Sequence, residues 1–320
     1  MVQLRKTIDH RQRSPEDILI SVIIAIYNGE KYLAQTLDSL ASQNGLVQGG
    51  KNNGIEVILI DDFSKDRSGK IIKHYTSFLE QRGFFVRHIT HQQNIGTTRS
   101  YTEGALNARG KYFKILDHDD LLASERALAE PVKYMESMEA CGCRVGAVFS
   151  QSLYIDAQNI VFGEKRFPFP FLPYEARNGL IPKKGGRFVL AFSPIYPFVH
   201  GSSVVRTICW QELSAALLSQ KQIGLFDVAF AIHLMHSKNW EVAYLRSPSL
   251  RYRIHATNYT QGVKDRKDWA DLLNAYYEEV YPPCVLLTAI KKWNRCVQLL
   301  KSLFRLYRGT NAYRCIKLFR

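Results

Sequence analysis

The chain has 320 residues, 46% of them hydrophobic, and a formal net charge of +14 at pH 7. This composition supports a sizeable core and excludes a disordered chain. No apolar stretch reaches the roughly 18 residues of a membrane-spanning helix, and the polar N-terminal segment lacks the apolar centre of a signal peptide. None of the six cysteines belongs to a Cys-x-x-Cys pair. We therefore expect a cytoplasmic protein with free thiols.

Apolar runs of strand length alternate with amphipathic segments over the first 150 residues. The predicted strands are residues 18–26, 55–60, 84–89, 111–116 and 145–149. The predicted helices are residues 30–43, 66–82, 94–108 and 124–139, the last with Ser124 as its N-cap. Strands that are almost wholly apolar and alternate with helices indicate an α/β fold, in which helices cover both faces of a mostly parallel sheet.

The sequence after residue 150 is less regular. The proline-rich segment 167–173 cannot form a helix interior or a central strand, and residues 183–186 are a second flexible stretch. We expect a long loop there, which either covers a binding site or is inert surface. Beyond it, the pattern predicts a helix at residues 226–235 and strands at 240–245 and 250–254.

Polar residues follow three of the predicted strands. They are Tyr27-Asn28, Asp61-Asp62 and Asp117-His118-Asp119-Asp120. Because ligands of parallel sheets bind at the carboxyl ends of the strands, we expect a binding site along this edge. The alternative is a solvated rim, since acidic pairs are common in turns and at helix starts.

The acidic cluster at Asp117–Asp120 suits a divalent cation. Its three carboxylates repel one another, and Mg²⁺ or Mn²⁺, which favour hard oxygen ligands, would relieve that repulsion. Mg²⁺ usually takes one or two protein carboxylates and completes its shell with water and substrate phosphates. The chain has neither a Gly-x-Gly-x-x-Gly fingerprint after the first strand nor a P-loop. A metal is therefore the expected holder of a phosphate-bearing ligand.

The order of these motifs resembles that of the family 2 glycosyltransferases, which have the GT-A fold. The resembling segments are Ser21–Asn28, Ile60–Asp66, Asn94–Gly96, Arg99 and Leu116–Asp120, with a weaker match at Tyr252–His255. The resemblance implies an inverting, metal-dependent transferase that uses a nucleotide-diphospho-sugar with Mn²⁺ or Mg²⁺. It favours UDP as the nucleotide, with GDP and dTDP as alternatives. The Gln-x-x-Arg-Trp string of processive members is absent, so we expect one sugar per encounter.

The resemblance also implies roles in donor binding. Tyr27 would lie against the nucleobase, and Asp62 or its neighbour Asp61 would accept a hydrogen bond from the base edge. Arg99 would face the diphosphate, although a surface arginine on a helix is the alternative. The remaining donor-binding candidates are Ala25, which stands where the family commonly has proline, and Asn28, Glu30 and His118.

Five further residues would serve the chemistry. Asp117 and Asp119 would form the Asp-x-Asp pair that reaches the ribose and holds the metal, with Asp120 supporting them. His255 would be a further metal ligand, although a lone histidine is more often structural. Asp227 would be the base that deprotonates the acceptor, with a helix N-cap as the alternative. Phe226 stands where the family has glutamate, which leaves the alignment at Asp227 open.

The C-terminal region is strongly basic. After Glu279 there are nine basic residues and no acidic one, and apolar residues from Leu286 to Tyr307 recur at helical spacing. A basic amphipathic helix suits an anionic membrane surface. Alternatively, its apolar stripe packs on the rest of the chain or on a partner protein. Nucleic acid is the weakest alternative and we expect none to bind, because the charge is confined to the tail.

These observations predict an N-terminal extension at residues 1–17 and a GT-A domain at 18–262, followed by a basic helical region at 263–320. Within the domain, residues 18–125 would bind the nucleotide-sugar and 126–262 the acceptor. The acceptor would be a glycan or a lipid-linked acceptor of cell-surface polysaccharide synthesis, met at the cytosolic face of the inner membrane by a peripherally bound enzyme. The competing hypothesis is a catalytically inactive nucleotide- or glycan-binding module of the same fold. A nucleotidyltransferase would need a glycine-rich phosphate loop.

Overall fold

The computed structural model describes residues 18–46, 54–165, 179–181, 200–218, 230, 234 and 237–255. All of them belong to one compact unit, Met1–Gly186 with Phe198–Ala256. A second unit, Arg187–Pro197 with Thr257–Arg320, lies outside the described residues. The predictions for the basic tail, for the loops at 167–173 and 183–186, and for Asp227 also fall outside them.

One mixed sheet forms the centre of the described unit, in the order β3-β2-β1-β4-β9-β6-β10-β5. Its first half contains β1 (Ile20–Ile26), β2 (Ile55–Asp61), β3 (Phe85–Thr90) and β4 (Tyr112–Ile115), all parallel to their neighbours within this half. Its second half contains β5 (Leu121–Leu122), β6 (Val145–Ile155), β9 (Ser203–Arg206) and β10 (Glu241–Arg253). Here β6 and β10 are parallel, and β9 is antiparallel to both β4 and β6. Two short strands, β7 (Val161–Lys165) and β8 (Gly179–Leu180), pair with β6 and β10.

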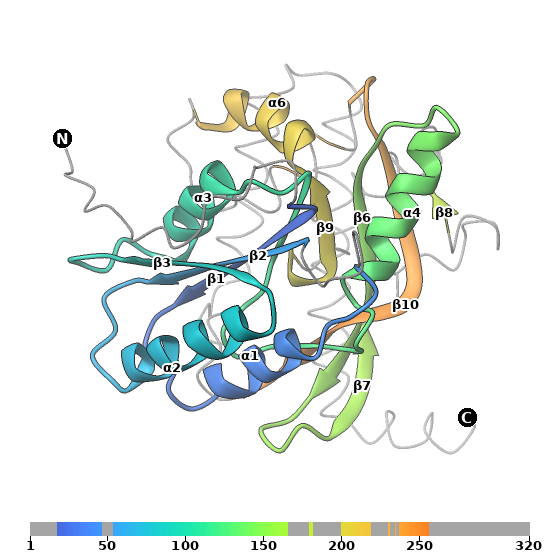
Figure 1. Cartoon of the computed structure of the whole chain (residues 1–320). Coiled ribbons are helices and arrows are strands. Elements are labelled where there is room, and N and C mark those ends of the chain that lie inside the picture. The colour runs from blue at the N-terminus through green and yellow to red at the C-terminus, as the bar shows by residue number, and fades with distance from the viewer. Residues whose placement is uncertain are drawn as a thin grey trace, which may run out of the picture. The chain divides into compact units, whose positions relative to one another are not determined.

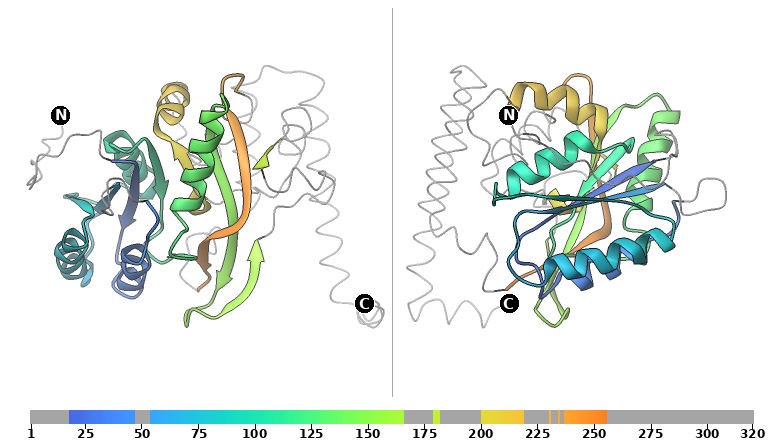
Figure 2. Two further views of the ribbon diagram at one scale, coloured as in Figure 1. Left: turned by 45° about the vertical axis from the view of Figure 1, so that its right-hand side comes forward. Right: turned by 60° about the vertical axis from the view of Figure 1, so that its left-hand side comes forward.

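Helices cover both faces of the first half of the sheet, as the alternating pattern predicts. Figures 1 and 2 show α1 (Leu33–Ala41) and α2 (Ser68–Gln81) on one face and α3 (Thr97–Asn107) on the other. Gly104 lets α3 approach closely, because a Cβ atom there would lie only 2.3 Å from a methyl group of Ile23 in β1. In the second half, α4 (Ala129–Ala140) packs on β6, and α6 (Thr207–Leu218) follows β9.

The apolar runs are buried because both faces of the sheet are covered. Every residue of β1 and of β2 is buried. On one face of the sheet, alternate side chains of the two strands join those of α1 and α4 in one continuous core; they are Ile20, Val22, Ile24, Ile26, Ile55, Val57 and Leu59. This core fixes the direction of β1, β2 and β4, and therefore the position of the loops that follow them. Among the described residues, no helix is long and apolar enough to cross a membrane.

Several predicted boundaries differ from the structure. Helix α4 begins at Ala129 rather than near Ser124, because the short strand β5 and a turn occupy residues 121–128. The Ser124 hydroxyl accepts a hydrogen bond from the Arg126 amide (3.3 Å) within that turn. Residues 241–253 form one strand with register irregularities near Pro248, where the sequence pattern predicts two strands. Strands β7 and β9 and helix α6 are not predicted by the sequence pattern.

Candidate active site

Three parallel strands bring their polar carboxyl ends to one edge of the sheet. β1 pairs in parallel with β2 and β4, so Tyr27, Asp61 and Asp117 lie at or just beyond strand ends that point the same way. The loop after β4 is also tied to α1, because the Thr36 hydroxyl donates to the His118 carbonyl (2.8 Å). The predicted convergence of strand ends is therefore present in the fold.

The loop after β1 leaves an aromatic ring exposed at this edge. Tyr27 is 46% exposed, which is unusual for a large aromatic side chain beside a core strand. Asn28 has a φ of 51°, a left-handed conformation that asparagine tolerates better than most residues. Its side-chain oxygen accepts the Lys65 amide (2.8 Å), and its own amide donates to the Ser64 hydroxyl (3.0 Å). Asn28 thus fastens the loop after β1 to the loop after β2.

Glu30 and Asp66 make a second reciprocal link between these two loops. The Arg67 amide donates to Glu30 Oε2 (3.0 Å), and the Glu30 amide donates to Asp66 Oδ2 (2.9 Å). Burial opposes ionisation of Asp66, but hydrogen bonds from Ser68 and from the Glu30 amide outweigh it and lower the pKa of Asp66. The carboxylates of both residues therefore join the loop after β1 to the loop after β2.

Asp62 holds the segment that leads into α3. Its two carboxylate oxygens accept the amides of Ile95 (2.8 Å) and Gly96 (2.9 Å), and Oδ1 lies 2.8 Å from His91 Nδ1. The other ring nitrogen of His91 lies 2.8 Å from Glu103 Oε2 on α3. Burial disfavours the imidazolium, but the bonds to Asp62 and Glu103 outweigh it and raise the pKa of His91.

The turn after β2 carries backbone strain. Phe63 has a φ of 70°, where a bulky side chain costs on the order of 1–3 kcal/mol. Asp61 Oδ1 accepts the Ser64 amide (2.9 Å), and the Lys65 ammonium lies 3.2 Å from the centre of the Phe63 ring. Strain of this kind clusters at functional sites, because packing elsewhere must maintain it.

Asp117 is held by a buried tyrosine of α3. The Tyr101 hydroxyl, in a side chain that is almost fully buried, donates to Asp117 Oδ1. Burial and the neighbouring carboxylates raise the pKa of Tyr101 well above its ordinary value, so it remains a donor. Sequence reasoning missed Tyr101, although it lies two positions after Arg99, the residue predicted to face the diphosphate.

Asp119 and Asp120 take different positions in the same loop. Asp119 is partly exposed, and its Oδ2 lies 2.9 Å from Nε2 of His255 beyond the end of β10. Asp120 is 1% exposed, and its Oδ1 accepts the Arg253 amide (2.8 Å). The partly exposed carboxylate of Asp119 can therefore contact a ligand, whereas the buried carboxylate of Asp120 binds the loop to β10.

Lys114 places a basic group inside β4, just below the acidic cluster. Its side chain is fully buried, and its Nζ donates to the Gly201 carbonyl. Burial lowers the pKa of Lys114 to about 7, an effect that the charge of Asp120 partly opposes. Sequence reasoning missed Lys114, although a lysine in the middle of an apolar strand is a signal that could have indicated it.

The other predicted site residues differ in their surroundings. His118 packs against Gly29, where a Cβ atom would lie 2.7 Å from the imidazole ring, and its Nδ1 lies 3.2 Å from the Ala25 carbonyl. Arg99 is exposed in the first turn of α3 and forms no ion pair with a described residue. Asp227 lies outside the described residues.

The donor set at the strand ends fits a hard divalent cation. Within the described part of the chain, no group of three or more His, Cys, Asp or Glu residues is arranged as a complete metal site. Asp117, Asp119 and His255 therefore do not form a preformed three-ligand site. Two carboxylates on one loop nonetheless suit Mg²⁺ or Mn²⁺, which take their other ligands from water and substrate phosphates.

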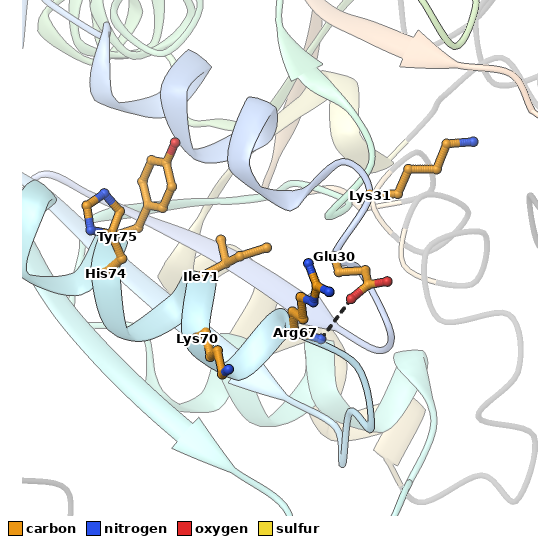
Figure 3. Close-up of a pocket in the computed structure, with 7 residues that line it drawn as sticks. All are labelled: Glu30, Lys31, Arg67, Lys70, Ile71, His74 and Tyr75. Carbon is orange, nitrogen blue, oxygen red and sulfur yellow. Dashed lines mark hydrogen bonds between the residues drawn. The ribbon is translucent and has the colours of Figure 1, made fainter.

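A basic groove of about 670 Å³ lies between the start of α1 and helix α2 (Figure 3). The residues that line it are Glu30, Lys31, Arg67, Lys70, Ile71, His74 and Tyr75. The Tyr75 hydroxyl donates to Asp38 (2.8 Å), and burial together with this bond raises the pKa of Tyr75 to about 12. No residue from Asp117 to Asp120 lines the groove, which is thus separate from the acidic edge of the sheet.

Comparison with solved structures identifies the fold. The chain matches residues 1–349 of S. aureus TarS in complex with UDP-GlcNAc with a TM-score of 0.59 and 14% identity, over 86% of this chain and 70% of that one. It matches the mannosyltransferase PcManGT from Pyrobaculum calidifontis, in complex with GDP-Man and Mn²⁺, with a TM-score of 0.55 and 13% identity, over 92% and 82% of the two chains. At these identities the likeness shows the fold, and the predicted GT-A architecture is confirmed.

Sequence comparison identifies the family. An uncharacterized glycosyltransferase of Methanocaldococcus jannaschii is 27% identical over 261 residues, which are 81% of this chain and 77% of the relative. The chain spans 59% of the length of the mycobacterial relatives that it matches. The family model described as "Glycosyl transferase family 2" matches residues 21–195, more than half of the chain. The chain therefore belongs to glycosyl transferase family 2, as its motifs predict.

Proposed function

We propose that this glycosyltransferase transfers one sugar from a nucleotide-diphospho-sugar, with UDP as the favoured nucleotide, to a hydroxyl group of a glycan or lipid-linked acceptor. The observation that carries the proposal is the arrangement of Asp117 and Asp119 at the end of β4, on the same sheet edge as the exposed Tyr27 and the Asp61 turn. This edge offers an aromatic face, carboxylates and hard oxygen ligands, which match a base, a ribose and a metal-bound diphosphate.

The nucleoside would bind over the ends of β1 and β2. Tyr27 would stack on the base, because its ring is exposed at the edge. Asp61 is the better candidate for the base-edge contact, since both oxygens of Asp62 already accept backbone amides. Asn28 and Glu30 would act indirectly, by holding the loop after β2 in place beneath the base.

The diphosphate would bind at the end of β4. Asp117 and Asp119 would hold Mn²⁺ or Mg²⁺, which, when bound, offsets the charge that develops on the leaving diphosphate. The nucleotide-sugar complexes of TarS and PcManGT, the latter with Mn²⁺, support this assignment. Arg99 would add a positive charge from the first turn of α3, where it is exposed.

The acceptor hydroxyl would attack the sugar from the face opposite the leaving group, which inverts the anomeric centre. A carboxylate must accept its proton, and Asp227 remains the candidate for this base. His255 would fix the Asp119 carboxylate through their 2.9 Å contact. The basic C-terminal region would hold the enzyme at an anionic membrane surface, where a lipid-linked acceptor of cell-surface polysaccharide synthesis would be met.

Metal-dependent hydrolysis of sugar nucleotides tests this proposal against an inactive binding module. A panel of UDP-, GDP- and dTDP-sugars is incubated with the full chain and Mn²⁺, and released nucleotide is measured. We expect turnover of at least one donor, abolished by chelation and by Asp119→Ala, but not by Glu80→Ala on the exposed side of α2. Donor binding without turnover, in the presence of acceptor extracts as well, would favour the binding module.

A further inference from the structure

Arg253 has a buried guanidinium group that contacts the loop proposed to hold the metal. It lies at the C-terminal end of β10, its side chain is 0% exposed, and it is among the largest fully buried side chains described. Arginine is almost never fully buried unless its donors are satisfied, because removing its charge from water is costly. The acceptors of its hydrogen bonds therefore indicate why the fold keeps a charged side chain at this position.

The donors of Arg253 reach three separate parts of the chain. Nε donates to the Asp119 carbonyl (2.7 Å), Nη1 to the Asp156 carbonyl (3.0 Å), and Nη2 to Gln35 Oε1 (3.0 Å). The guanidinium carbon also lies 4.4 Å from the centre of the Tyr32 ring, a cation–π contact. One planar group thus joins the loop after β4, the turn after β6, and helix α1.

The same end of β10 also holds Asp119 and its neighbour Asp120 by two further contacts. The backbone amide of Arg253 donates to Asp120 Oδ1 (2.8 Å), and Nε2 of His255 lies 2.9 Å from Asp119 Oδ2. The His255 ring also lies against Tyr32, with ring centres 5.0 Å apart. The main chain of Asp119 and its carboxylate are thus both fixed from β10.

A purely structural role does not require this arrangement. Apolar side chains of similar volume fill a buried space as well or better, because they avoid the desolvation of a charge. What a planar guanidinium adds is direction, since its fixed donors define where three acceptors must lie. The acceptor with the shortest bond is the carbonyl of Asp119, the residue whose carboxylate would meet the metal.

We infer that Arg253 is a positioning residue, which orients the Asp119 carboxylate for the metal and diphosphate without touching either. This inference rests on the proposed function, because it concerns the same donor site. It assigns the end of β10 to the donor half of the site, although Arg253 lies 133 residues beyond Asp120 in sequence. The group that acts on the ligand is Asp119, and Arg253 acts through it.

Mn²⁺ binding in the presence of UDP tests this inference without turnover. The loss of the free Mn²⁺ signal in electron paramagnetic resonance is measured for the full chain, for Arg253→Lys and for Gln35→Ala. Arg246→Lys, on the exposed part of the same strand, is the matched control. Because residues that orient metal ligands typically change affinity by 10–100-fold, we expect Arg253→Lys to weaken Mn²⁺ binding about tenfold or more, and Arg246→Lys to leave it unchanged. Melting temperatures establish that each variant is folded.

The outcomes separate the inference from the proposed function. Wild-type protein that binds no Mn²⁺ with UDP would overturn the proposed donor site, and this inference with it. Normal wild-type binding, with a folded Arg253→Lys variant within about twofold of it, would overturn the positioning role alone. If Arg253→Lys fails to fold, Gln35→Ala decides, because it removes one acceptor and keeps the charge. Weaker Mn²⁺ binding by that variant supports the role, and unchanged binding overturns it.

Discussion

Nε2 of His255 lies 2.9 Å from Oδ2 of Asp119, although 136 residues separate them in sequence. This contact joins the end of β10 to the loop after β4, and places an imidazole beside the outer carboxylate of the acidic cluster. A histidine in this position fixes one oxygen of Asp119 and so defines the direction of the carboxylate. We predict that His255→Ala lowers kcat/KM for the donor by about tenfold or more, with a loss of apparent Mn²⁺ affinity. A variant with wild-type metal dependence would show that the contact is only structural.

Removal of the Tyr101 hydroxyl tests whether its hydrogen bond to Asp117 orients that carboxylate for the metal. Tyr101→Phe deletes the hydroxyl that donates to Asp117 and keeps the ring in the core. We expect a higher concentration of Mn²⁺ for half-maximal activity, because Asp117 loses the donor that orients it. Tyr75→Phe is the matched control, since it deletes a hydroxyl that donates to Asp38 in the groove between α1 and α2. Equal metal dependence of the two variants would contradict the assignment.

The contribution of Lys114 to the free energy of unfolding should increase with pH, whereas that of Lys111 should not. Burial lowers the pKa of Lys114 to about 7, so its protonated form is disfavoured in the fold, and this destabilisation is relieved as pH rises above that value. The pKa of Lys111 shifts in the opposite direction. Burial lowers this pKa, but hydrogen bonds to Glu136 and Glu139 raise it overall, so protonation of Lys111 stabilises the fold.

We therefore expect the free energy of unfolding of wild type, relative to Lys114→Met, to increase between pH 7 and about pH 10. The same comparison with Lys111→Met should show no such increase. Urea unfolding monitored by circular dichroism at several pH values measures both differences. A pH-independent difference for Lys114→Met would mean that this lysine remains protonated throughout.

His91 should stabilise the fold at low pH. Its pKa is raised, because its bonds to Asp62 and Glu103 outweigh the effect of burial. The stabilisation is complete below the ordinary histidine pKa, and it is lost as pH rises through the higher pKa of the folded state. We predict that the difference in melting temperature between wild type and His91→Gln falls as pH increases from about 6 to 8. Direct titration of the ring by NMR gives the pKa itself, and a value below 6.5, its ordinary value, would contradict the prediction.

The basic C-terminal region should bind the protein to anionic membranes. We expect the full chain to float with liposomes that contain phosphatidylglycerol, and a variant that ends at Pro282 to float less, because each basic residue near such a surface adds about 1 kcal/mol. Neutral liposomes are the control for the electrostatic contribution. Equal flotation of both proteins would contradict a membrane role for this region.

The parallel half of the fold could be predicted because its signals are local. Ile20–Ile26 and Ile55–Asp61 are nearly continuous apolar runs, and each is followed by an amphipathic helix, which leaves few alternatives to a parallel sheet. The antiparallel strand β9 was not predicted, because the four residues Ser203–Arg206 owe their place in the sheet to pairing with β4 and β6. Such pairing partners are distant in sequence and leave no periodic signal.

In the candidate site, too, local sequence signals could be read, whereas contacts between distant segments could not. Asp117 and Asp119 are visible in the sequence, because several carboxylates at one strand end indicate a ligand. The roles of Asp62 and Glu30 were harder to foresee, since their carboxylates accept amides from loops that only the fold brings near. Arg253 lies in the weakly matching segment Tyr252–His255, but its contacts could not be predicted, because its acceptors are mainly backbone carbonyls whose positions depend on tertiary structure.

A crystal structure with a UDP-sugar and Mn²⁺ would test the central claim most directly. The proposed function predicts Mn²⁺ bound by a carboxylate oxygen of Asp117 or Asp119, with the diphosphate completing its coordination shell and the uracil stacked on Tyr27. A donor bound elsewhere, for example in the basic groove between α1 and α2, with no metal at Asp117 or Asp119, would contradict the claim.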